Sequence, residues 1–271
     1  MKKNILIVLV LVIFIAFAWW HFTATEDERT GSQKNNQPTL SDYSTAPADN
    51  VTAPAKKVRW NFDGEEYAPS GTPRACPDPL EIESPVDVSK ASSILYPGQY
   101  RGDDFKAHGG FRFDGYRSDA ITVTVPLDAR LQDASRYIED GQVQYLFDFI
   151  HDCGIMYRFD HLATLTPRFE AYARQLPEAK VNDSRTTLFP DDVYVTTGDV
   201  IATSVNREGN VFVDFGVYDL RQKNGITIDE KNSLARHGIC WFDLLPASDA
   251  QRVKSLPASD ERSGAKSEYC R

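Results

Sequence analysis

The sequence predicts a mainly β fold, and three observations support this prediction. Several short runs alternate apolar and polar residues, which is the period of a strand with one buried face. Gly, Pro and Asp residues separate these runs at regular spacing, as expected for antiparallel strands in a sandwich or barrel. The 271-residue chain is 41% hydrophobic and 25% charged, a composition typical of a globular protein with a core.

The chain begins with two lysines and an apolar run, residues 5–20, that ends in Trp19 and Trp20. We interpret residues 1–22 as a transmembrane anchor or a signal peptide. The run is short for a spanning helix, but the tryptophans favour the membrane boundary and extend its reach. No small-residue cleavage site follows it, which favours the anchor. Lysines before the run predict a cytoplasmic N-terminus and an extracytoplasmic domain.

Three further segments follow from the composition. Residues 23–75 are polar and lack apolar periodicity, so we expect a flexible linker. Residues 76–246 form the predicted β-rich domain, and residues 247–271 are expected to be a flexible tail unless Cys270 is bonded. In an exported domain the four cysteines predict one or two disulfides, for example Cys240–Cys270, although four free thiols are the alternative.

The predicted elements of the domain follow the alternating runs in order. Strands are expected at residues 108–114, 121–125, 141–149, 154–159, 193–195 and 211–215. One helix is expected at residues 167–176, because Pro167 suits a first helical turn. The net charge of −9 and the lack of a basic stripe argue against nucleic acid as a partner.

The first of these strands carries a polar row. Period-two alternation places Phe111 and Phe113 on one side, where dense aromatics are expected to build the core. The other side carries His108, Gly110, Arg112 and Asp114. A row of polar groups on a rigid strand predicts a site, which either binds a ligand or catalyses a reaction.

Several segments resemble motifs of one family. His108-Gly-Gly110 resembles the start of a His-x-Gly-x-Asp metal motif, and residues 159–162, with His161, resemble a Tyr-x-His-Leu segment. Asp214 begins a segment that lies where a His-x-His motif belongs. Together, over residues 108–221, the chain resembles the lysostaphin-type zinc endopeptidases, which cut peptidoglycan cross-bridges. The resemblance implies the duplicated hybrid motif fold, an antiparallel β sandwich or barrel, and a catalytic role for His161.

The resemblance departs from the family at the metal ligands. Arg112 stands where a carboxylate ligand belongs. Asp214 and Gly216 or, in a shifted register, Val213 and Phe215 replace the His-x-His pair. Only His108 remains of three ligands, whereas zinc hydrolases need about three protein ligands. The positive charge of a guanidinium at this ligand position would also repel a divalent cation, by on the order of several kcal/mol at a few Å. We therefore favour no metal and expect no cofactor.

Three interpretations of the polar cluster stay open. Arg112 could pair with Asp214 or Asp114 at the former metal position, which would make the domain a binding or scaffolding module. Alternatively, His108, Asp114 and Asp214 could form a relocated site for zinc or manganese, with His161 as acid and base. In the third interpretation, the polar residues only satisfy one another.

The sequence thus predicts a membrane-anchored, extracytoplasmic, peptidase-like domain without activity. Its expected partners are cell-wall peptide or glycan, or a wall hydrolase that it regulates. The expected binding residues are His108, Arg112, Asp114, Arg158, Asp214 and Tyr218. The alternative is an active metallopeptidase that acts on peptidoglycan through a noncanonical zinc site, and only then would His161 be catalytic.

Overall fold

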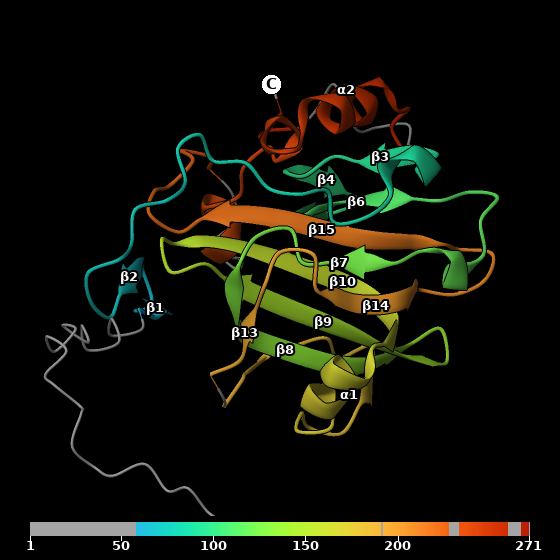
Figure 1. Cartoon of the computed structure of the whole chain (residues 1–271), viewed down its shortest axis with the longest axis horizontal. Coiled ribbons are helices and arrows are strands. Elements are labelled where there is room, and N and C mark those ends of the chain that lie inside the picture. The colour runs from blue at the N-terminus through green and yellow to red at the C-terminus, as the bar shows by residue number, and fades with distance from the viewer. Residues whose placement is uncertain (1–57, 191, 228–232, 260–266, 271) are drawn as a thin grey trace, which may run out of the picture. The chain divides into compact units, whose positions relative to one another are not determined.

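One large sheet organises the part of the chain that the structure describes (Figure 1). The structure is a computed structural model that describes residues 58–190, 192–227, 233–259 and 267–270, all within the unit Pro54–Arg271. Eleven strands join in this sheet, and its main path runs in the order β11-β8-β9-β10-β15-β6-β3. Every pair along the path is antiparallel except β11 and β8, which are parallel.

The strands of the main path differ greatly in length. Their bounds are β3 (Ser93–Leu95), β6 (Gly109–Arg112), β8 (Ala129–Glu139), β9 (Gln142–Ile150), β10 (Ile155–Leu165), β11 (Lys180–Val181) and β15 (Phe212–Asp219). Shorter strands join the sheet off this path: β7 (Val123–Thr124), β12 (Thr187–Leu188), β13 (Tyr194–Val195) and β14 (Val200–Val205). Two hairpins form separate two-stranded sheets: β1 (Trp60–Phe62) with β2 (Tyr67–Pro69), and β4 (Gln99–Arg101) with β5 (Asp104–Lys106).

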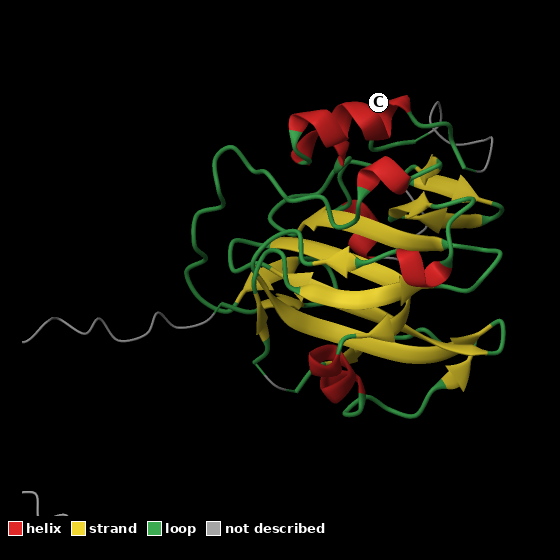
Figure 2. Cartoon of the chain, turned by 45° about the vertical axis from the view of Figure 1, so that its right-hand side comes forward, coloured by secondary structure: helices red, strands yellow, loops and turns green. Residues whose placement is uncertain are grey.

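Helices in the described residues are few. Helix α1 (Pro167–Ala173) follows β10 and lies near β8 and β9 (Figures 1 and 2). Helix α2 (Ala247–Ser255) lies near the β3 end of the sheet. Four short 3-10 helices complete the list: Val88–Lys90, Ser118–Ala120, Ser233–Arg236 and Phe242–Leu244. No helix in the described part of the chain is long and apolar enough to cross a membrane.

The alternation of side chains divides the sheet into a core face and a polar face. On β9, Phe147 and Phe149 are fully buried in the main core, while Gln144 and Asp148 point to the opposite face. Fully burying one such aromatic side chain contributes about 1.5–3 kcal/mol. The aromatic core therefore fixes the register that also positions the polar face.

The prediction of a mainly β chain is confirmed. The predicted runs overlap the strands β9, β10, β13 and β15. No closed barrel forms among the described strands. The predicted helix is present as α1, with Pro167 at its first position. The alternating runs did not include β8, because a register shift between Leu131 and Asp133 interrupts its alternation.

The structure describes only some of the predicted anchor, linker and tail segments. The expected anchor, residues 1–22, and residues 23–57 of the expected linker lie outside the described residues. The last part of that linker forms the β1–β2 hairpin, and the expected tail begins with α2, whose Ala250 and Val253 are buried. Two disulfides join Cys76 to Cys153 and Cys240 to Cys270, so the C-terminal segment is bonded as the sequence suggested.

Candidate functional site

Neighbouring strands place a row of charged side chains on the polar face of the sheet. Asp133 on β8 is the cross-strand partner of Asp148 on β9, and Asp148 is the partner of Arg158 on β10. Arg158 in turn lies opposite Gly216 on β15. Cross-strand partners have Cβ atoms about 4.5–5.5 Å apart, so this row brings together groups that are distant in sequence.

A second row, two residues further along the strands, contains Asp214. Asp160 on β10 lies opposite Asp214 on β15, and Asp214 lies opposite Gly110 on β6. His108 immediately precedes β6, so its side chain comes to the same region as Asp214. The polar row predicted for residues 108–114 therefore contributes only its first part to this region.

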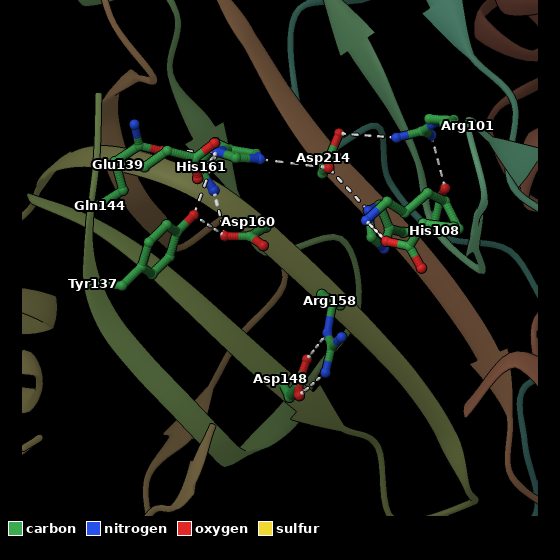
Figure 3. Close-up of polar contacts among 12 residues, drawn as sticks. Arg101, His108, Tyr137, Glu139, Gln144, Asp148, Arg158, Asp160, His161 and Asp214 are labelled. Carbon is green, nitrogen blue, oxygen red and sulfur yellow. Dashed lines mark hydrogen bonds and ion pairs between the residues drawn. The ribbon is translucent and has the colours of Figure 1, made fainter. Parts of the chain in front are cut away.

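Three basic side chains converge on Asp214 (Figure 3). His108 Nε2 lies 3.0 Å and His161 Nε2 lies 3.6 Å from Asp214 Oδ2. Arg101 Nη1 lies 4.0 Å from the other carboxylate oxygen, Oδ1, which accepts no hydrogen bond. The structure thus brings together three residues that the sequence singled out, His108, His161 and Asp214, and adds Arg101.

The Asp214 carboxylate is buried, with only 5% of the residue exposed. Burial alone would raise its pKa, because a charge is poorly solvated in the interior. Attraction by His108, with which it forms a hydrogen bond, and attraction by His161 and Arg101 outweigh burial. The net result is a pKa well below the ordinary value, so Asp214 stays ionised.

Two glycines allow this close packing. A Cβ at Gly110 would lie 2.9 Å from Asp214 Oδ1 and 2.6 Å from the backbone oxygen of Val213. A Cβ at Gly216 would lie 2.8 Å from the Cβ of His108 and 2.7 Å from the Tyr218 hydroxyl. The space beside His108 is therefore already filled, and position 216 offers no side chain as a ligand.

His161 reaches the polar face through a distortion of β10. Its φ is 63°, in the left-handed region, and the pairing of β10 with β9 shifts register between Phe159 and Leu162. A bulge of this kind turns a side chain that would otherwise point to the core. The backbone N–H of His161 donates a hydrogen bond of 2.8 Å to Asp160 Oδ1, which holds the distortion.

The imidazole of His161 is oriented by neighbours on β8 and β9. Gln144 Oε1 lies 2.7 Å from its Nδ1, and an amide oxygen can only accept, so Nδ1 carries a proton. The Tyr137 hydroxyl lies 3.3 Å from the same nitrogen and donates to Asp160. Burial, followed by the charge of Asp160, raises the pKa of the Tyr137 phenol, which therefore keeps its proton.

Arg158 and Asp148 form a bidentate ion pair on the first row. Arg158 Nε and Nη2 donate hydrogen bonds of 2.7 Å and 2.6 Å to the two carboxylate oxygens. Burial lowers the pKa of Arg158, but the charge and hydrogen bond of Asp148 raise it further, so the guanidinium stays charged. Tyr218, another predicted binding residue, is fully buried in a small core with Trp60 and Met156 and supports the site from within.

Arg112 and Asp114 lie elsewhere on the sheet. Arg112 Nη2 lies 3.2 Å from Asp114 Oδ1 and Nη1 lies 3.1 Å from Asn210 Oδ1. The Arg112 guanidinium also sits 5.9 Å from the ring centroid of Phe212, whose ring is in turn 4.6 Å from that of His161. The structure therefore pairs Arg112 with Asp114 but does not bring this pair to His108 and Asp214.

A polar cleft of about 600 Å³ opens over the converging residues, and we call it the central cleft. Its lining consists of Asp104, Phe105, Lys106, His108, Tyr137, Glu139, Leu146, Arg158, Asp160, His161, Ser184, Arg185, Thr186 and Asp214. Among the predicted site residues, His108, Arg158, His161 and Asp214 line this cleft. Both signs of charge border it, so it can bind a ligand that carries both.

The described residues contain no group of three or more His, Cys, Asp or Glu side chains that could hold a metal ion. The relocated set His108, Asp114 and Asp214 is thus not assembled, since Asp114 bonds to Arg112 and Ser92 instead. The sequence did not single out Tyr137, Gln144 or Asp148. Asp148 could have been noticed as a charged residue between Phe147 and Phe149, within a run that is otherwise apolar at this end of β9.

Comparison with known proteins adds no relative. No family model, no curated protein and no solved structure matches the chain. The resemblance to lysostaphin-type peptidases therefore stays a prediction from the quoted segments.

Proposed function

We propose that this chain is a membrane-anchored, extracytoplasmic binding module that holds cell-wall peptide in the central cleft without cleaving it. In this proposal the fold is a degenerate form of the duplicated hybrid motif. The proposal joins the sequence resemblance, which suggests the wall as the environment, to the chemistry of the cleft.

One observation carries the proposal. His108, the single retained ligand of the family set, directs its Nε2 to the buried carboxylate of Asp214 at 3.0 Å. Gly216 provides no second ligand, and the space that a side chain there would need is filled by His108 and Tyr218. An imidazole engaged in this way supports a binding role better than a metal-activated hydrolysis.

The charges around the central cleft suit a peptide with both ammonium and carboxylate groups. At its border the exposed guanidinium of Arg185 can bind a carboxylate and Glu139 can bind an amine, whereas Lys106 and Asp104 already pair with each other. Cell-wall peptides carry both kinds of group. The carboxylate of Asp214 and the bidentate Arg158–Asp148 pair are already balanced, so we assign them to the floor of the cleft.

The two disulfides support an extracytoplasmic location. Disulfides form and persist in oxidising compartments and are rare in the cytosol. All four cysteines of the chain are paired, Cys76 with Cys153 and Cys240 with Cys270. This pairing agrees with the topology proposed from the N-terminal lysines.

The test is a binding titration of the full chain, in detergent, with a purified wall stem peptide. Arg185→Ala removes an exposed cleft guanidinium that pairs with Asp183, two residues away. Arg117→Ala is the matched control, since Arg117 is exposed, pairs with Asp119 and lines none of the clefts described here. We expect Arg185→Ala to raise the Kd about 3- to 10-fold, because a contact from an exposed guanidinium contributes roughly 1 kcal/mol.

Equal affinities of the two variants would remove the central cleft from the binding site. If the wild-type chain failed to bind stem peptide but bound a purified wall hydrolase, the role would be regulation of that partner instead. Cleavage of the peptide with stoichiometric bound zinc would support the metallopeptidase alternative.

A further inference from the structure

A second cleft, which we call the hairpin cleft, adjoins the central cleft. It has a volume of about 450 Å³ and lies where the β1–β2 hairpin meets the polar face of the sheet. Its lining consists of Trp60, Asn61, Phe62, Tyr67, Gln132, Asp133, Asp148, Ile150, Met156, Arg158, Thr186 and Leu234. The two clefts share Arg158 and Thr186, so one groove continues from the His108–Asp214 pair to the hairpin.

Polar groups without protein partners line the hairpin cleft. Gln132 is only 7% exposed, yet its Oε1 has no hydrogen-bond partner. A buried amide oxygen without a donor is unfavourable, so a site that leaves one unbonded suits a ligand that donates a hydrogen bond. No described residue donates a hydrogen bond to the neighbouring Asp133 carboxyl either.

An aromatic surface forms the opposite side of the hairpin cleft. Phe62 and Tyr67 are cross-strand partners with ring centroids 5.1 Å apart. Phe62 is 42% exposed although it is a large apolar side chain. Exposed aromatic rings beside hydrogen-bonding groups are typical of places where a ligand with an apolar face and a polar edge binds.

We propose that the hairpin cleft binds a sugar ring, with Phe62 against the apolar face of the ring and Gln132 and Asp133 bonded to its hydroxyl groups. This inference rests on the proposed function and deepens it. The ligand becomes a glycan-linked peptide, with its peptide in the central cleft and its sugar in the hairpin cleft.

The cleft suits a ligand that both donates and accepts hydrogen bonds. Burial, and then the charge of Asp148, raise the pKa of Asp133 to about 6, so a ligand carboxylate would be disfavoured there. Arg158 forms a bidentate pair with Asp148, so the two together add no net charge to the cleft. Hydroxyl groups both donate and accept, and they can therefore bond to Asp133 in either protonation state.

The test is calorimetric titration of the full chain, in detergent, with the β-1,4-linked tetramer of N-acetylglucosamine. Phe62→Ala and Asp133→Ala should each raise the Kd by about 10-fold, as expected for loss of one good contact. Tyr116→Ala is the matched control, because Tyr116 is also 42% exposed but lines neither cleft. Its Kd should stay within about 2-fold of that of the wild type.

Absence of tetramer binding to the wild-type chain, or equal binding by Phe62→Ala, Asp133→Ala and Tyr116→Ala, would overturn the inference. So would a loss of stem-peptide binding in Asp133→Ala that exceeds its loss of tetramer binding, because an amine would then be the ligand. Stem-peptide titration of Arg185→Ala and Arg117→Ala tests the proposed function separately, so the two proposals can fail independently.

Discussion

His108 Nε2 lies 3.0 Å from Oδ2 of Asp214, so the residue that immediately precedes β6 and a residue within β15 are bonded to each other. The same oxygen lies 3.6 Å from Nε2 of His161. This buried carboxylate is thus held by a hydrogen bond from one imidazole and by the proximity of a second. Contacts between residues of the chain therefore stabilise this part of the polar face.

Substitution of Gly216 tests the close packing beside His108. Gly216→Ala should lower the free energy of unfolding by about 1–3 kcal/mol, because the new methyl group would overlap His108 and Tyr218. Gly71→Ala is the control, since no atom lies within 4 Å of a Cβ there and no positive φ is required. Urea denaturation measures both, and equal stabilities would show that the site is not packed as described.

Loss of one partner of the Arg158–Asp148 pair should destabilise the fold much more than replacement of both partners together. Arg158→Met leaves the buried Asp148 carboxylate without its partner and should destabilise the chain by about 3–5 kcal/mol. The double variant Arg158→Met with Asp148→Leu should recover most of this loss. A double-mutant cycle of unfolding free energies measures the coupling, and strict additivity would contradict a bonded pair.

Asp133 predicts a specific pH dependence of stability. Its pKa is raised to about 6, so the native state binds the proton more tightly than the unfolded state does. Proton binding by Asp133 therefore stabilises the folded state fully at pH values below the pKa of an unfolded Asp. This stabilisation, at most about 3 kcal/mol, is lost as the pH rises through the folded-state pKa of about 6.

Asp133→Asn cannot ionise and should therefore lack this loss. Unfolding free energies measured for both proteins at pH 4 and pH 8 should show the variant gaining on the wild type at the higher pH. A difference between the proteins that does not change with pH would contradict the environment assigned to Asp133.

The two disulfides should stabilise the domain. The residues of Cys240–Cys270 are 30 apart in sequence, for which loop-closure entropy predicts about 4 kcal/mol. Cys240→Ala with Cys270→Ala should therefore lower the unfolding free energy by about that amount, and it should release helix α2 to faster hydrogen exchange. A peptide map without reductant should recover the linked pair in the wild type, and unlinked cysteines there would refute the assignment.

The sequence predicted the strands whose alternation is regular. Residues 142–150 alternate without interruption and form β9, whereas β8 was missed because of its bulge near Gln132. This omission also concealed Tyr137 and Asp133, since both lie on β8. An alternation rule identifies strands but does not show which residue a bulge adds.

The site was predictable only in part for a related reason. His108, His161 and Asp214 converge, and the resemblance placed all three in one region. Arg112 was expected beside them, but it lies opposite Phe212, two residues along β15 from Asp214. Two residues of a strand span about 6.6 Å, a displacement set by the register of β6 on β15, which the sequence does not reveal.

The most direct test incubates the full chain with purified cross-linked cell wall and one equivalent of zinc. Two quantities are measured, the protein retained on the wall and the free amino groups that cleavage of cross-bridges would release. We expect retention that is reduced in Arg185→Ala but not in Arg117→Ala, with no rise in amino groups. A rise in amino groups that requires zinc and is lost in His161→Ala would contradict this expectation and would establish a metallopeptidase.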